Sequence, residues 1–202
     1  MTPTVWFTFV CSVLLIMGNA QPRASSHLLN GEPQQAPVNV DAKTMAEFTQ
    51  RIEAYAALHR KVESGLTKLS NNSTPQEIDR HQRAFGTALA AARAGAKQGD
   101  LFSPSMQAVA RRLMEQLFKN AESRRQLRES LMDDNPPPSQ VRVAVNARYP
   151  DAVPLSTMPP EVLKNLPPLP KEVEYRFVGD TLILLDPDAH IVADFVGRVL
   201  PK

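Results

Sequence analysis

The stretch "YRFVGDTLILLDPDAHIVADFV", residues 175–196, decides the fold of this chain. Apolar and polar residues alternate along much of it, which is typical of strands that bury one face. Gly-Asp at residues 179–180 suits a two-residue hairpin turn with glycine at the first central position. Asp-Pro-Asp-Ala at residues 186–189 suits a type I turn, with Asp first and Pro second. The stretch therefore predicts a three-stranded antiparallel meander.

The first turn also predicts the register, because opposing Val178 and Thr181 places Tyr175 beside Leu184. One face of the meander is then expected to be apolar: Val173, Tyr175, Phe177, Leu182, Leu184, Ile191, Ala193 and Phe195. A bulge at the second turn would shift the third strand by one residue and exchange its faces. Three short strands need a cover. The local candidate is a short helix carrying Val162, Leu163 and Leu166; the alternatives are the helical region and a partner chain.

Outward from the meander, the composition divides the chain into zones. Residues 21–40 are rich in Gln, Pro, Asn and Ser, which predicts a disordered tether. Residues 41–135 contain two prolines, each at a suitable helix start, whereas residues 136–202 contain twelve. The sequence therefore predicts an α+β protein, in which a helical domain at 41–135 precedes a Pro-rich α+β unit at 136–202.

The helical zone has the period of amphipathic helices. One stripe at spacings of three and four is Met45, Phe48, Ile52, Tyr55, His59, Val62, Leu66 and Leu69. Thr74-Pro75 with Glu77 predicts a second helix with a capping box, and Ser103-Pro104 begins a third. The pattern then slips, so Leu127 and Leu131 indicate a fourth, shorter helix or a bend. We expect an antiparallel bundle of three or four helices, or a long helical hairpin with additions.

The N-terminus has the features of a signal peptide. Residues 5–17 are apolar apart from a Thr and a Ser, which suits a signal-peptide core and is too short to span a membrane. Cleavage is expected near Ala20, although the absence of Lys and Arg before the apolar run leaves an uncleaved N-terminal anchor as the alternative. Cleavage would remove Cys11, the only cysteine, which excludes cysteine nucleophiles and thiolate metal sites from the mature chain. We expect a periplasmic or secreted protein without a later membrane-spanning segment.

Several segments also carry a resemblance. "QGDLFSP" at 98–104 and "NARYPDAVPLSTMPPEVLKNLPPLPKEVEYRFVGDTLILLDPDAHIVADFV" at 146–196 resemble a group of uncharacterised exported bacterial proteins. Their C-terminal pattern is RYP…TMPP…LPPLP…EYRFVG…LILLD…IVDF, and here Ala193-Asp194 stands at its Val-Asp. This resemblance implies a Gram-negative periplasmic or secreted setting. More remotely, the terminal hairpin is similar to that of periplasmic nickel and cobalt homeostasis proteins, which implies no metal here.

The "DPDAH" turn has ligand types for a divalent cation in Asp186, Asp188 and His190. A calcium loop is excluded, because Ile191 stands at the position that requires glycine and Gly197 at the position that requires glutamate. Each residue also suits a turn followed by a strand. We therefore interpret the motif as structural.

A second candidate metal site lies on the first two helices. His59 and Glu63 are four residues apart on one helix, and Glu77 and His81 are four apart on the next. If the helices fold back near residue 72, Glu63 lies level with His81. Histidines and carboxylates on facing helices can form a metal site in a bundle. The alternative is a partly buried His59 with solvated flanking pairs.

Other chemistries have less support. The formal net charge is +2, and residues 103–135 hold six basic and five acidic side chains, so no nucleic-acid partner is indicated. The chain has no G-x-S-x-G, H-E-x-x-H, phosphate loop or dinucleotide fingerprint. No catalytic residue and no cofactor are predicted.

The sequence thus favours a non-enzymatic accessory protein of the bacterial cell envelope that binds an unknown protein partner. Long amphipathic helices and a small sheet carry stripes and edges that a partner can complete, and the helices can also self-associate. The alternatives are a periplasmic metal-binding or metal-homeostasis protein that uses the helix histidines, and a hydrolase of unrecognised type.

Overall fold

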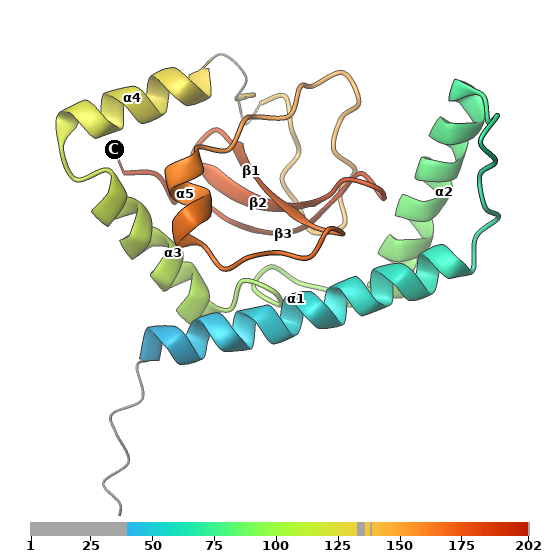
Figure 1. The fold of residues 1–202 in the computed structure, drawn as a ribbon, viewed down its shortest axis with the longest axis horizontal. Coiled ribbons are helices and arrows are strands. Elements are labelled where there is room, and N and C mark those ends of the chain that lie inside the picture. Colours follow the sequence, from blue (N-terminus) through green and yellow to red (C-terminus); the bar gives the residue numbers. More distant parts are fainter. Residues whose placement is uncertain (1–39, 133–135, 138, 202) are drawn as a thin grey trace, which may run out of the picture. The chain divides into compact units, whose positions relative to one another are not determined.

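Helices precede the sheet along the chain. The computed structural model describes residues 40–132, 136–137 and 139–201. Its elements are α1 (Val40–Ser64), α2 (Pro75–Ala92), α3 (Pro104–Leu117), α4 (Ala121–Met132), α5 (Pro160–Asn165), β1 (Glu174–Val178), β2 (Thr181–Asp186) and β3 (Ile191–Val196) (Figure 1). The predicted α+β class that ends in a meander is confirmed. Within the described residues, no helix combines the length and apolarity needed to cross a membrane.

The sheet has the order β1-β2-β3, with both neighbouring pairs antiparallel. Val178 opposes Thr181 and Tyr175 opposes Leu184, as the first turn predicts. Gly179 has a φ of 58°, which suits glycine at the first central position of this hairpin. The predicted register of the first hairpin is therefore confirmed.

The second hairpin contains an irregularity inside β3. Leu185 opposes Val192, whereas Leu184 opposes Asp194, so Ala193 is an additional residue in the ladder. Before this bulge, Ile191 lies on the face expected for it. After the bulge the faces exchange, and the expectation that Phe195 lies on the same face is wrong. The register shift falls within the strand and not at the turn.

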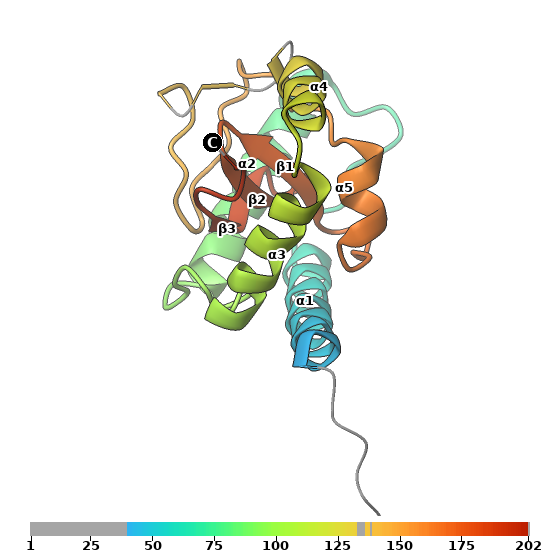
Figure 2. The same cartoon turned by 90° about the vertical axis from the view of Figure 1, so that its left-hand side faces the viewer.

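One face of the sheet packs against the helices. Figures 1 and 2 show α3 and α5 next to each other beside the strands, with α1 beneath them. Three residues of the short helix α5 were predicted to cover the sheet. Val162 and Leu166 are buried, but Leu163 is 47% exposed. The helices and strands share one core: its largest fully buried members are Phe48, Ile52, Phe85, Leu89, Phe102, Met106, Met114, Phe177, Leu182 and Leu184. The described residues accordingly belong to one compact unit.

The opposite face of the sheet is buried as well, which the sequence did not predict. A second, smaller core contains Val141, Tyr149, Val178, Ile183, Leu185 and Val192. The alternation of Val141, Val143 and Val145 with other residue types predicts a short strand at residues 141–145, and this strand does not form. Instead, residues 141–149 lie across this face, and among these described residues only Arg148 forms a bridge, to Ile191.

Contacts from the same chain cover the sheet edges. At the β3 edge, the amide of Asn146 donates to the Val192 carbonyl, and the Val192 amide donates to the Ala147 carbonyl. At the β1 edge, the Ser156 hydroxyl donates to the Phe177 carbonyl and accepts from the Phe177 amide. These edge groups therefore already have hydrogen-bond partners in the same chain and are not free to pair with an added strand.

Candidate functional site

A buried carboxylate joins α1 to the turn between β2 and β3. Tyr55 on α1 donates its hydroxyl to Asp186 Oδ2 at 2.8 Å, and His59 Nδ1 lies 2.7 Å from the same oxygen. The other oxygen, Oδ1, accepts the amide of Ala189 at 2.8 Å. All three side chains are at most 4% exposed. Asp186 thus has hydrogen-bond partners on both oxygens, and it links α1 to the turn.

The outer nitrogen of His59 faces two more carboxylates. Its Nε2 lies 3.8 Å from Glu63 Oε2 and 3.7 Å from Asp188 Oδ2. Burial lowers the pKa of His59, but the hydrogen bond and charge of Asp186, with the charges of Asp188 and Glu63, outweigh burial and raise it. The ring stands edge-on to Phe85 of α2, with centroids 4.8 Å apart. His59 therefore contacts both α2 and the turn, and the carboxylates around it favour its protonated form.

Helix α2 approaches the same turn at Gly86. A Cβ added to this glycine would lie 2.5 Å from the carbonyl oxygen of Ala189, which is too short for any real contact. Gln82, one turn earlier, donates its side-chain amide to the Pro187 carbonyl at 3.4 Å. The turn is therefore held from two sides, by α1 and by α2.

A second buried aspartate, Asp194, holds the segment that leads into α3. Its carboxylate accepts the amides of Gly99, Leu101 and Phe102, at 3.1, 2.9 and 2.8 Å. Burial raises the pKa of Asp194, although these amides oppose the rise. The β3 bulge places this carboxylate on the helical face of the sheet. Asp194 therefore anchors backbone that has no regular structure of its own.

The four helix residues proposed as metal ligands are only partly brought together. Glu63 and His81 line the same hollow of about 470 Å³, as the expected helix alignment requires. His59 instead turns to Asp186, and Glu77 accepts the amide and hydroxyl of Thr74 at 2.7 and 2.9 Å in the predicted capping box. In the described part of the chain, no group of three or more His, Cys, Asp or Glu side chains is placed to hold a metal ion. Metal binding stays a prediction.

The "DPDAH" residues have separate environments. Asp186 is fully buried, Asp188 is 63% exposed at its side chain, and His190 has a φ of 55° immediately before β3. His190 Nε2 lies 3.5 Å from Asp151 Oδ1. The contact between Asp186 and His59 joins a residue of the predicted turn motif to a residue of the predicted helix metal site. The sequence did not predict this contact. His59 lay on a predicted apolar stripe, whereas Asp186 was assigned to a turn. The available signal was the need of a buried polar side chain such as His59 for a partner.

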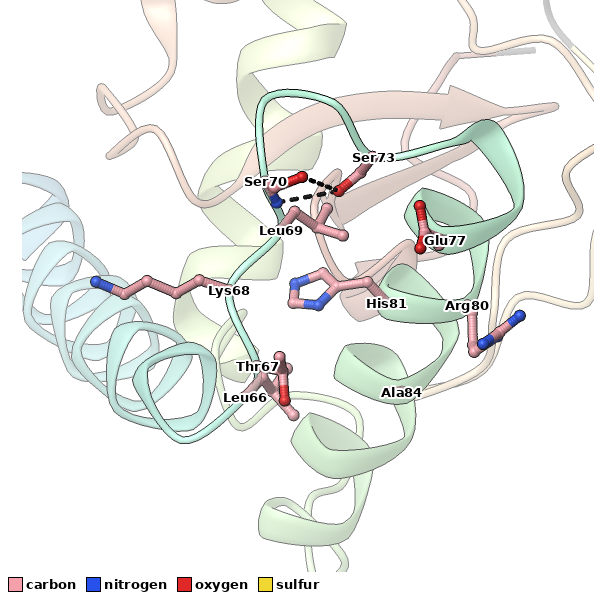
Figure 3. Close-up of a pocket in the computed structure, with 10 residues that line it drawn as sticks. All are labelled: Leu66, Thr67, Lys68, Leu69, Ser70, Ser73, Glu77, Arg80, His81 and Ala84. Carbon is pink, nitrogen blue, oxygen red and sulfur yellow. Dashed lines mark hydrogen bonds between the residues drawn. The ribbon is translucent and has the colours of Figure 1, made fainter.

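The corner between α1 and α2, residues 65–84, has a different character. It contains a hollow of about 530 Å³ between the connecting loop and α2, with His81 in its middle (Figure 3). The lining residues are Leu66, Thr67, Lys68, Leu69, Ser70, Ser73, Glu77, Arg80, His81 and Ala84. We call this region the α1–α2 corner.

The start of α2 and the loop after α1 carry apolar side chains into this corner, beyond the core. On α2, Leu89 and Phe85 are 0% and 2% exposed, but Ile78 of the same stripe is 49% exposed. α1 ends at Ser64, so the expectation that its stripe extends to Leu69 is wrong: Leu69 lies in the loop after the helix and is 42% exposed. The first buried residue of α2 is Phe85, so its first turns project from the core. The corner therefore presents apolar side chains that the described chain leaves open.

Comparisons with known proteins supply no relative. No family model, no curated protein and no solved structure matches this chain. Function is therefore inferred from the geometry of the molecule.

Proposed function

We propose that this chain is an exported, non-enzymatic protein that binds a protein partner at the cell envelope through the α1–α2 corner. Export is expected from the apolar run at residues 5–17 and the small residues that follow it. The corner supports the binding role, because apolar side chains that project beside a hollow are typical of interaction surfaces.

One observation carries this proposal: Leu69, in the loop after α1, and Ile78, in the first turn of α2, are exposed, although the stripe of α2 is buried further along the helix. Burial of a large aliphatic side chain contributes roughly 1.5–3 kcal/mol, so a partner that covers both gains substantially. The sheet offers less, because its two faces are buried and edge groups such as Val192 and Phe177 already have partners.

The contacts of the buried titratable groups favour a structural role for them. Asp186 and His59 join two elements, and Asp194 holds three backbone amides. A buried carboxylate with this many partners has few lone pairs left for a substrate. Metal homeostasis and hydrolysis stay separate hypotheses, and metal analysis of natively purified protein tests the first of them.

Site-specific photocrosslinking tests the proposed function. A photoreactive aromatic residue is placed at position 69 or 78 of the full chain, and the variants are expressed in the source cell. Leu163 on α5 is the matched control, because it is 47% exposed and lies outside the corner. We expect one discrete crosslinked protein from positions 69 and 78 and none from position 163.

Two outcomes contradict the proposal. The first is the absence of any crosslinked protein from both corner positions in correctly exported protein. The second is the same pattern of products from position 163, which would indicate collisions without a preferred surface.

A further inference from the structure

The α1–α2 corner has hollows on both sides of its connecting loop. The hollow of about 530 Å³ adjoins α2, and the one of about 470 Å³ adjoins the end of α1. They share four lining residues: Leu66, Lys68, Leu69 and His81. A binding segment that crosses the loop would therefore meet apolar side chains in the middle.

The acidic residues of the corner are already engaged. Glu77 accepts two hydrogen bonds from Thr74 at the start of α2. Glu63 faces His59, with 3.8 Å between Oε2 and Nε2. Their negative charge is thus partly offset within the chain.

Two basic residues of the corner have no such pairing. Among the described residues, neither Lys68 nor Arg80 forms an ion pair. The pKa of Glu77 is lowered mainly by its hydrogen bonds with Thr74 and to a smaller extent by the charge of Arg80. Elsewhere Arg112 lies 2.6 Å from Asp41, and Arg125 lies 2.7 Å from Glu122. In Figure 3, Lys68 and Arg80 extend on opposite sides of the hollow that holds His81. The corner therefore has an apolar centre and, on each flank, a cation that forms no ion pair within the described part of the chain.

We propose that the α1–α2 corner binds a protein segment in which an apolar side chain is flanked on both sides by Asp or Glu. This inference rests on the proposed function and names the chemistry of its partner. The apolar residue enters beside Leu69, and the carboxylates meet Lys68 and Arg80. Charges at the rim of an apolar contact accelerate association and select among partners more than they add affinity.

Charge reversal tests this inference without touching the apolar centre. The crosslinker is placed at Ser70, which is exposed and lines the hollow. It is combined with Lys68→Glu plus Arg80→Glu, or with the control pair Lys97→Glu plus Lys119→Glu, which makes the same charge change on exposed residues outside the corner. We expect the corner pair to reduce capture about fivefold to tenfold and the control pair to leave it unchanged.

A milder variant and a salt series keep the test independent of folding. Lys68→Gln plus Arg80→Gln should give an intermediate loss, and capture by the unchanged chain should weaken as ionic strength rises. Unchanged thermal midpoints show that the variants are folded. Mass spectrometry of the captured segment should find acidic residues on both sides of the crosslinked position.

The possible outcomes distinguish a failure of this inference from a failure of the proposed function. If the unchanged chain captures a protein, and both charge-reversed pairs capture it equally, the proposed function stands and the acidic-segment inference is wrong. A captured segment without acidic residues, or a second copy of this chain, overturns the inference in the same way. If the unchanged chain captures nothing at Ser70, Leu69 and Ile78, both fail.

Discussion

The β2–β3 turn and the α1–α2 corner are built from the same two helices and differ in what covers them. At the turn, Tyr55 and His59 of α1 meet Asp186, and Phe85 of α2 packs against His59. Two helical turns before Phe85, Ile78 of α2 is 49% exposed, and Leu69, in the loop after α1, is 42% exposed. The difference shows that amphipathic periodicity identifies an apolar stripe but not where its cover ends.

The largest expected effect on stability comes from Asp194, which lies in the buried part of the molecule. Asp194→Ala removes the acceptor of four backbone amides, three of them at residues 99–102 and one at Phe195, and should destabilise the fold by on the order of 3 kcal/mol. Glu115→Ala, at an exposed position of α3, is the control and should stay within about 0.5 kcal/mol. Urea unfolding of both variants measures the difference. Equal stability would mean that the segment at residues 99–102 needs no anchor.

The next effect tests how tightly α2 meets the turn. Gly86→Ala places a Cβ 2.5 Å from the Ala189 carbonyl oxygen, and the forced shift should cost about 1–3 kcal/mol. Gly95→Ala is the matched control, because no atom lies within 4 Å of its added Cβ, and it should change stability by less than about 1 kcal/mol. Thermal unfolding of the two variants side by side checks this. A Gly86→Ala protein as stable as the control would contradict the close contact.

A smaller effect comes from the charge on His59. The folded state raises the pKa of His59 above its ordinary value of 6.5, so its contribution is fully present below pH 6.5. That contribution is lost as the pH rises through the folded pKa. We expect the thermal midpoint to fall over this range in the unchanged chain and to fall less in His59→Gln, whose amide can still donate to Asp186.

The cause of the His59 shift has its own control. Asp188→Asn removes one of the nearby charges and should lower the pKa of His59, measured from its ring resonances by NMR. Asp180→Asn, in the first hairpin turn, should leave the titration unchanged. If both substitutions give the same pKa for His59, Asp188 does not contribute to the shift.

The smallest effect on stability is expected at the corner, together with the largest effect on binding. Leu69→Asp and Ile78→Asp alter side chains that are 42% and 49% exposed, so each should change stability by less than about 1 kcal/mol. Crosslinking from Ser70 should nevertheless be lost. A marked fall in the unfolding midpoint would mean that these side chains complete the core.

The local signals in the sequence predicted the first hairpin well. Gly179 and the alternation around it determine the turn and the register, because both depend on neighbouring residues alone. The capping box at Thr74 was likewise predictable from four adjacent positions. Local chemistry of this kind needs no knowledge of the remaining fold.

The missed features depend on distant residues. His59 and Asp186 are 127 positions apart, and neither has a neighbour in sequence that indicates the other. The bulge at Ala193 places Asp194 toward the amides of residues 99–102, and the alternation of β3 does not reveal it. The second core depends on the path of residues 139–156, whose valines suggested a strand. Tertiary contacts override the local pattern in all three cases.

Hydrogen exchange of the free chain and of its complex with the captured partner tests the central claim most directly. Amides of residues 65–84 should exchange more slowly in the complex, because the partner covers the α1–α2 corner, while those of β1–β3 should be unchanged. Slower exchange confined to α4, α5 or the strands, with the corner unaffected, would contradict the assignment of this surface.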